Sequence, residues 1–330
     1  MRRSTVSNTA RINIYITIGV IVLITLICCS LFIGKFPLSL AKILEGDEFQ
    51  IKIFWTLRFS RTLVGVFGGI SLGIAGFVYQ ILFRNPLASP DIIGVSSGAS
   101  AGAAFGILFF SGALSITVCS FGGALISVIL VIMLSHLDRN DKKGTIILAG
   151  IAVHSLAQTF LMILKTIADP EKELASIEYW IMGSLNGVNS HAILGNMILC
   201  LACLSVLILL NRQILLLSQD EAEAKLLGVD VYTMRLVILI LSTLVVSSVV
   251  SLTGLISFIG LLAPHSARRL TKDNSVKTCI LCGIIGGIIL LIADILARSI
   301  SQTELPVSIF TSLIGAPFLI FLIFKGRDRI

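Results

Sequence analysis

Ten long runs of apolar residues, separated by short polar segments, constrain this chain of 330 residues more than any other feature. Apolar residues make up 56% of the chain and charged residues only 13%, and a soluble domain of this size cannot bury that much apolar surface. A helix that crosses a bilayer needs about 20 mostly apolar residues, and helices are the default because the bilayer offers the backbone no partners. We therefore predict an all-α polytopic membrane protein in which residues 1–330 form a single transmembrane domain. The predicted spans are 13–34, 62–83, 90–110, 112–135, 145–166, 191–210, 234–252, 255–270, 279–297 and 307–324.

The distribution of positive charge predicts how the chain lies in the membrane. With ten spans and the N-terminus inside, the cytoplasmic segments hold 17 of the 25 Lys and Arg residues but only 9 of the 18 Asp and Glu residues. This excess is the positive-inside bias, and it places both termini in the cytoplasm. In a soluble protein a net charge of +7 would suggest nucleic acid as a partner. Here orientation in membrane lipid explains the charge, and no nucleic acid is expected.

Sequence signals of catalysis are missing. The chain has no G-x-x-x-x-G-K-[ST] sequence, hence no P-loop of its own, and no Ser/His/Asp set is discernible. The CxxC pairs Cys200–Cys203 and Cys279–Cys282 lie in apolar helices without nearby His or Asp, so we expect them to pack and not to bind a metal. The carboxylates of Asp91, Asp294 and Glu304 fall near predicted helix ends. The lack of a buried ionisable relay makes an ion-coupled secondary transporter the weaker alternative.

Glycine recurs every four residues in the second and third spans. Small residues at this spacing let membrane helices approach closely, so we expect these two spans to pack tightly against neighbours. The positions are Gly65, Gly69, Gly73, Gly98, Gly102 and Gly106.

A polar segment, RNPLASPDIIGVSSGAS at residues 84–100, separates the second and third spans. Asn85 precedes Pro86, which disfavours helix at Asn85. Ser89 is predicted to cap the next helix, with Pro90 at its first position. The segment is therefore expected to be a tight cytoplasmic turn. It is either a capped turn followed by small packing residues or a gate that lines a water-filled path.

The longest cytoplasmic loop, about residues 211–233, contains the polar stretch Ser218–Gly228. Ser218 and Glu221 have the spacing of a capping box, and Gly228 suits a helix C-terminus. We predict a short soluble helix whose apolar residues are Ala222, Leu226 and Leu227. The helix is either a solvated connection or a plug for the groove of a cytoplasmic partner. The partner is favoured because transport would otherwise lack a source of energy.

Three arginines lie at the predicted outer ends of two spans. Arg58 and Arg61 precede the second span, and Arg298 follows the ninth. Arginines at such positions commonly reach headgroups or solvent. Alternatively, the cluster binds carboxylates of an external partner, which the guanidinium fork suits.

In order along the chain, several motifs together make it resemble the FecCD-type permease family of ABC importers. They are Leu57-Arg-Phe-Ser-Arg61, Asn85-Pro-Leu-Ala-Ser-Pro90, Gly94-Val-Ser-Ser-Gly98, Trp180-Ile-Met-Gly-Ser-Leu185, Gly254-Leu-Ile-Ser-Phe-Ile-Gly-Leu-Leu-Ala-Pro-His265, Asp294-Ile-Leu-Ala-Arg298, Glu304-Leu-Pro306 and Gly315-Ala-Pro317. The resemblance runs from the first span to the C-terminus.

The resemblance implies a type II ABC-importer permease architecture in a bacterial cell membrane. It implies a dimer with an identical or related permease, two cytoplasmic ATPase subunits that bind ATP and Mg²⁺, and an external binding protein. The permease itself is then not an enzyme and binds no cofactor or metal. Its substrate is expected to be an iron chelate, with a ferric siderophore first and haem or vitamin B12 next.

The same resemblance implies roles for individual residues. Arg58, Arg61 and Arg298 match positions that dock the binding protein. Cytoplasmic gate positions are matched by Asn85, Leu87 and Thr145. The stretch that couples to the ATPase is matched by Ser218, Glu221, Ala222, Leu226, Leu227 and Gly228.

Two positions depart from the family pattern. Ser60 lies between the outer arginines where the family often has Pro, and Ser308 follows Glu-Leu-Pro-Val where Gly is usual. We expect looser local backbone at both positions, with every charged residue of the motifs retained.

Overall fold

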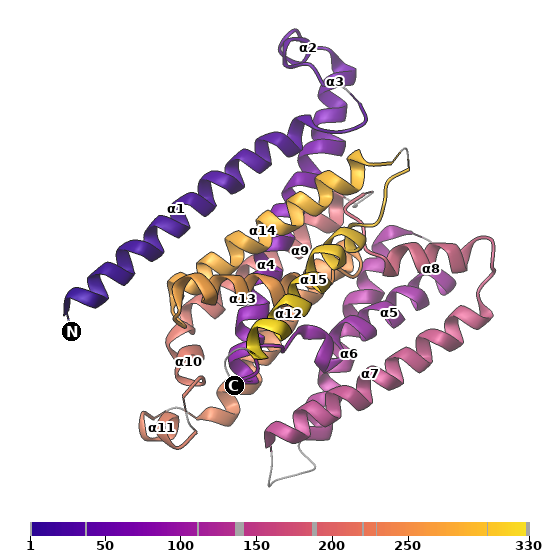
Figure 1. The fold of residues 1–330 in the computed structure, drawn as a ribbon. Coiled ribbons are helices and arrows are strands. Elements are labelled where there is room, and N and C mark those ends of the chain that lie inside the picture. Colours follow the sequence, from indigo (N-terminus) through magenta and orange to yellow (C-terminus); the bar gives the residue numbers. More distant parts are fainter. Residues whose placement is uncertain are drawn as a thin grey trace.

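The computed structural model shows a bundle of helices (Figure 1). It describes residues 2–36, 38–110, 112–135, 142–186, 190–219, 221–228, 230–301 and 303–327. In these ranges every regular element is helical. The elements are α1 (Arg2–Phe32), α2 (Leu40–Leu44), α3 (Glu48–Ile53), the π-helix η1 (Phe54–Phe59), α4 (Ser60–Leu82), the 3-10 turn η2 (Pro90–Ile93), α5 (Val95–Phe109), α6 (Ala113–Ser135), α7 (Lys142–Ile167), α8 (Glu173–Ile181), α9 (Ser190–Leu209), α10 (Asn211–Leu216), α11 (Glu221–Leu226), α12 (Val231–Thr253), α13 (Ile259–Thr271), α14 (Val276–Ser299) and α15 (Val307–Arg327).

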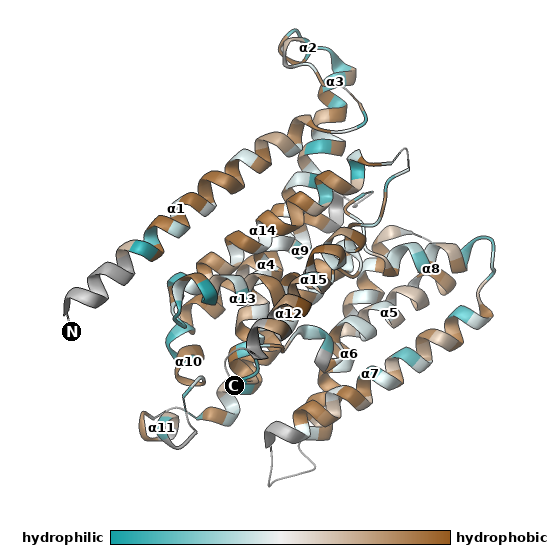
Figure 2. Ribbon diagram, viewed as in Figure 1, coloured by the Kyte–Doolittle hydropathy of each residue, from teal (hydrophilic) through white to brown (hydrophobic). Residues whose placement is uncertain are grey.

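Each of the ten predicted spans corresponds to a helix, so the all-helical, multi-span prediction is confirmed. Among the described residues, six helices are long and apolar enough to cross a membrane, and α5, α9 and α15 contain shorter apolar stretches. Apolar residues run along α1 and the other long helices, whereas hydrophilic ones gather near helix ends (Figure 2). Only 6% of the apolar stretch of α1 is buried within the chain, as expected of a helix that faces lipid.

Two predicted spans are broken near their starts. The span at 90–110 begins as the 3-10 turn η2, and α5 starts only after Gly94, which has a left-handed φ of 76°. The span at 255–270 begins with a non-helical stretch, because Gly254 and Phe258 both have positive φ, and α13 starts at Ile259. A left-handed residue cannot continue a right-handed helix, so both helices are shorter than their apolar runs.

The glycine repeats bring two helix pairs into backbone contact, as predicted. A Cβ on Gly69 or Gly73 of α4 would collide with the α14 backbone at Gly286 or Cys282. Likewise, a Cβ on Gly98 or Gly102 of α5 would collide with the α6 backbone. Small residues therefore set the helix spacing in this membrane protein.

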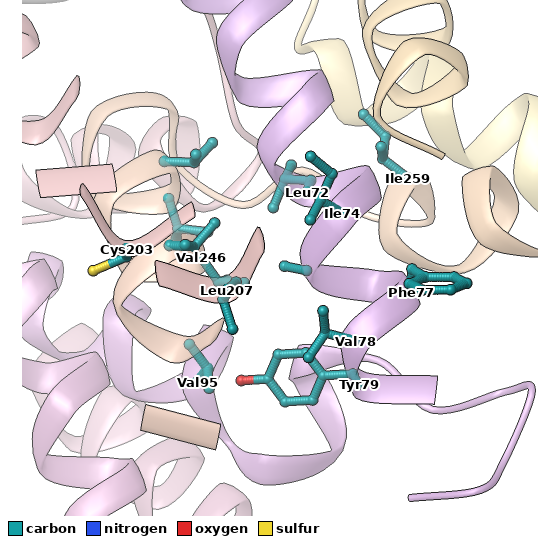
Figure 3. Packing of buried hydrophobic residues seen from close by; sticks show 14 of the residues in the cluster. Leu72, Ile74, Phe77, Val78, Tyr79, Val95, Cys203, Leu207, Val246 and Ile259 are labelled. Carbon is teal, nitrogen blue, oxygen red and sulfur yellow. The ribbon is translucent and has the colours of Figure 1, made fainter. Parts of the chain in front are cut away.

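The core lies where α4 meets α9, α12 and α13. Buried side chains there include Phe77, Leu207 and Val246, and the Tyr79 hydroxyl lies 2.9 Å from Thr243 Oγ1 (Figure 3). Cys200, Cys203 and Cys282 belong to the same apolar cluster, so these cysteines pack as predicted.

Polar loops gather at two opposite ends of the bundle. One end carries α2, α3, α8 and residues 303–306 before α15, and the other carries the 83–89 turn, α10 and α11 (Figure 1). They are named the outer end and the inner end, following the orientation predicted from charge.

Candidate functional site

The three predicted docking arginines converge at the outer end with two carboxylates, and these five side chains are named the outer cluster. Arg58 lies in η1, Arg61 in the first turn of α4 and Arg298 in the last turn of α14. Asp294 lies one helical turn before Arg298, and Glu304 lies in the loop that leads to α15.

Arg61 joins the two carboxylates of the outer cluster. Its Nε donates to Asp294 Oδ1 at 2.8 Å, and its Nη1 donates to Glu304 Oε2 at 2.8 Å. The other Asp294 oxygen lies 3.5 Å from Arg298 Nε. Asp294 thus bridges α4 and the end of its own helix, and its side chain is fully buried.

The other two arginines bind carbonyl groups in the last turn of α1 and in the segment just after it. Arg298 Nη2 donates to the Ser30 carbonyl at 2.9 Å and to its hydroxyl at 2.6 Å. Arg58 donates to the carbonyls of Ile33 at 2.8 Å and Phe36 at 3.0 Å. The last carbonyls of a helix lack intrahelical partners, and positive charge is favourable at that end. The arginines therefore fasten the outer end of α1.

The alternative in which these arginines reach headgroups or solvent does not fit the free chain. Arg58, Arg61 and Arg298 are only 5%, 7% and 2% exposed. The interpretation from sequence treated Asp294 and Glu304 as isolated carboxylates near helix ends and missed that they pair with the arginines. A signal was present in the four-residue spacing of Asp294 and Arg298, which places them on one helix face.

Both serines that depart from the family pattern form hydrogen bonds. The Ser60 hydroxyl donates to the Trp55 carbonyl at 2.9 Å, five residues back and within the π-helical segment. The Ser308 hydroxyl donates to the Leu255 carbonyl. Each hydroxyl thus ties the local backbone, so the structure gives no reason for the looser backbone expected there.

The predicted gate turn is compact at the inner end. The Asn85 side-chain oxygen accepts a hydrogen bond from the Leu87 N–H at 2.9 Å, and the Asn85 backbone carbonyl accepts one from the Ala88 N–H at 3.0 Å. Leu87 is 55% exposed. Arg84 Nε donates to the Leu217 carbonyl at 3.0 Å, which ties the turn to the end of α10.

The predicted helix cap at Ser89 is not observed. Ser89 has an extended backbone, but its hydroxyl lies 3.5 Å from Asp91 Oδ2 and makes no capping bond. Asp91 instead accepts a hydrogen bond from Ser96. The reason is local: the residues after Ser89 form the short 3-10 turn η2, and α5 starts only after Gly94.

A cavity of about 300 Å³ adjoins the turn. It is lined by Ser89, Asp91 and Ser96 on one side and by residues of α12 and α13, such as Val250 and Leu261, on the other. The third predicted gate residue, Thr145, is partly buried near the start of α7, and α7 packs against η2.

The predicted cytoplasmic helix is present as α11, but it starts later than its proposed cap. The Ser218 hydroxyl donates back to the Leu215 carbonyl at 2.6 Å, and the Glu221 half of the predicted capping box lies outside the described residues. The side chains of Glu221 and Ala222 lie outside the described residues. Gly228 ends the segment with a φ of +80°, as predicted for a C-terminal glycine.

Large apolar side chains project from α11 and the turn that follows it. Leu226 is 87% exposed and Leu227 is 64% exposed, whereas Ala224 is fully buried against the protein. Among the described side chains of this segment, Ala224 therefore faces the protein, while Leu226 and Leu227 point outward at the inner end.

Comparison with known families decides what kind of protein this is. Residues 22–325 match the FecCD transport family. The chain belongs to this family. The permease protein MolB of the molybdate import system of Haemophilus influenzae is 35% identical over 309 residues, which is 90% of this chain and 91% of that protein. The achromobactin transport system permease protein CbrC of Dickeya dadantii is 30% identical, covering 94% of this chain and 91% of CbrC.

Solved structures agree with this assignment. A structure of an inward-facing metal-chelate type ABC transporter superposes with a TM-score of 0.86 at 33% identity, covering 94% of this chain and 98% of that one. PsaBC from Streptococcus pneumoniae has a TM-score of 0.57 at 18% identity, which shows likeness of fold alone. The FecCD protein described here is therefore the permease subunit of an ABC importer, in which a separate subunit hydrolyses ATP.

The outer end of this FecCD permease contains a groove of about 670 Å³. One wall is α8, which contributes Tyr179 and Trp180, together with Lys172 just before it. The opposite wall comes from the α5–α6 hairpin and the end of α12. Aromatic, apolar and charged groups thus face a single space large enough for a sizeable ligand.

Proposed function

We propose that this permease forms the path for a bulky iron chelate, with a ferric siderophore first and haem or vitamin B12 next. The outer groove carries the proposal, because 670 Å³ far exceeds what a small oxyanion such as molybdate needs. Among relatives, several permeases are named for vitamin B12 and one for achromobactin, whereas MolB is named for molybdate.

Transport by the reconstituted importer tests the substrate. Proteoliposomes would contain the permease with its ATPase. Separate samples would receive an external binding protein loaded with ferric siderophore, haem, cobalamin or molybdate. We expect ATP-dependent, vanadate-sensitive uptake of an iron chelate that an uncoupler leaves intact. Uptake confined to molybdate would contradict the substrate proposal, and uptake confined to cobalamin would contradict its first choice, the ferric siderophore. Liposomes without the ATPase are the control.

The proposed assembly uses both ends of the chain. A second permease subunit shares the path, two ATPase subunits bind the inner end, and a binding protein docks at the outer end. Exposure of Leu226 and Leu227 supports ATPase binding, because an ATPase groove would cover apolar surface that the chain leaves bare. Both termini are proposed to lie in the cytoplasm, as the charge bias indicates.

The Asn85–Leu87 turn, together with Thr145, is proposed to constrict the inner end of the path. The exposed Leu87 and the adjoining cavity support this. Cysteine at Leu87 in both permease subunits should crosslink in the closed state and block uptake. Cysteine at Leu209, which is 78% exposed on α9, serves as a control for background crosslinking. If the Leu87→Cys pair crosslinks in no nucleotide state, the turn is not a gate.

The outer cluster is proposed to dock the binding protein through carboxylates of that partner. Support comes from the charge of the cluster, which contains three arginines and two carboxylates. Burial changes how such docking would work, since a partner's carboxylate must approach a site that the permease's own groups already occupy in part.

A further inference from the structure

Two carboxylates of the outer cluster contact the same arginine but differ in their surroundings. Asp294 is fully buried and lies between Arg61 and Arg298. The Glu304 side chain is 25% exposed and contacts Arg61 from an irregular loop. The pair with Asp294 is thus an interior one, whereas the pair with Glu304 lies at the rim.

The outer cluster also holds donors that are not in use. Within the described residues, Arg61 Nη2 and Arg298 Nη1 are buried and have no hydrogen-bond partner. Buried guanidinium groups normally find acceptors, because an unsatisfied charged donor is costly. Together with the excess of one positive charge, these donors fit one additional carboxylate.

The backbone around Glu304 is held independently of its side chain. The Leu305 N–H donates to the Ala297 carbonyl at 3.1 Å, and the Val307 N–H donates to the Gly183 carbonyl at 3.0 Å. The carboxylate can therefore leave Arg61 by rotation of its side chain while the loop stays in place. Asp294 has no such freedom, because solvent does not reach it.

We propose that Glu304 is an internal stand-in for the partner's carboxylate. It occupies Arg61 Nη1 in the free permease and yields this position when the binding protein docks. Asp294 does not exchange, and it is the positioning residue that holds Arg61 and Arg298 for the incoming group. This inference rests on the proposed docking function of the outer cluster.

The stand-in arrangement predicts opposite effects for two carboxylates on one arginine. Glu304→Gln removes the competitor, so the binding protein should bind about two- to fivefold more tightly, as expected for loss of a partly exposed ion pair. The gain should shrink at high salt. Asp294→Asn frees the arginines from their orientation, so binding should weaken by roughly tenfold or more. A purely structural network would weaken docking in both variants.

The experiment measures affinity of the permease–ATPase complex in nanodiscs for the binding protein that supports uptake in the proteoliposomes. Arg61→Lys tests the docking site itself, because lysine keeps the charge but loses the fork. Glu45→Gln is the matched control, since Glu45 is an exposed carboxylate at the same end. Thermal unfolding of every variant checks the fold, and Glu304→Gln remains decisive if Asp294→Asn unfolds.

Three results are informative. Tighter binding by Glu304→Gln with weaker binding by Arg61→Lys supports the stand-in. Weaker or unchanged binding by Glu304→Gln, while Arg61→Lys is impaired, overturns the stand-in and leaves docking intact. Unchanged binding in all variants, Arg61→Lys included, overturns the docking proposal and this inference with it.

Discussion

The outer cluster and the α11 segment are opposite exceptions to the rule that charged side chains are exposed and large apolar ones are buried. At the outer end three arginines are buried, and at the inner end Leu226 and Leu227 are exposed. Charged side chains are seldom fully buried unless paired, and exposed leucines are ordinary only when scattered. The buried arginines find partners within the chain, because Asp294, Glu304 and carbonyls in and just after the last turn of α1 bind them. Among the described residues, Leu226 and Leu227 stay largely exposed.

This difference separates stability from function. Groups of the outer cluster hold three helices together, so changes there should act first on folding. The leucines near α11 contribute little to the free chain, so changes there should act only when a partner is present. Each of the following predictions tests this separation.

Asp294→Ala should have the largest effect on stability. It leaves Arg61 and Arg298 buried without their shared carboxylate, and breaking a buried pair in this way typically costs about 3–5 kcal/mol. Thermal unfolding of the purified permease, together with the yield of inserted protein, measures the loss. If the variant is as stable as the parent, the outer cluster is not what fastens α1 and α4 to α14.

Gly228→Pro should abolish coupling to the ATPase while leaving the permease inserted. Proline fixes φ at about −65°, whereas Gly228 has a φ of +80°. The turn after α11 must therefore change course. Gly228→Ala is the milder variant, since a Cβ there meets no atom within 4 Å and only the left-handed backbone is strained, by about 1–2 kcal/mol. Normal uptake and normal stimulation of ATP hydrolysis by Gly228→Pro would refute the coupling role.

Helix positions could be predicted from sequence because the bilayer imposes length and composition on each span. The runs around α6, α7, α12 and α14 match their helices within a few residues. The breaks at Gly94 and Phe258 were missed, since they depend on φ values that apolar patterning does not encode. A non-glycine residue such as Phe258 carries no local signal of a left-handed conformation.

The candidate site was only partly predictable for a related reason. The residue types and their end of the membrane follow from motifs and charge bias, but burial follows from packing. Arg61 meets Glu304 across 243 positions of sequence, and Arg58 meets the Ile33 carbonyl just after α1. Local spacing reveals neither contact. The same holds for Ser218, whose hydroxyl bonds backward to Leu215 although its spacing to Glu221 is that of a capping box.

Leu226→Asp should weaken ATPase binding without altering the stability of the free permease. Burying a leucine contributes about 1.5–3 kcal/mol, so the affinity should fall by roughly 10- to 100-fold. Leu44→Asp is the matched control, because Leu44 is 84% exposed at the opposite end. Co-purification and titration with the ATPase give the affinity. Equal losses for both variants would mean that the leucine of α11 has no special partner.

Ser60→Ala should have the smallest effect, and it tests whether the outer end owes its rigidity to the outer cluster or to the π-helical segment beside it. The substitution removes the 2.9 Å hydrogen bond from the Ser60 hydroxyl to the Trp55 carbonyl and leaves the neighbouring Arg58 and Arg61 in place. That bond is exposed, so solvent or headgroups can satisfy the freed carbonyl, and the free energy of unfolding should fall by less than about 1 kcal/mol. Binding-protein affinity should not change, because Arg58 and Arg61 keep their partners. The measurements are those used for Asp294→Ala, made on the same preparation. If the free energy of unfolding fell as much as in Asp294→Ala, the stability of the outer end would depend on the π-helical segment. The contrast between an outer end held by buried ion pairs and an inner end that depends on a partner would then fail.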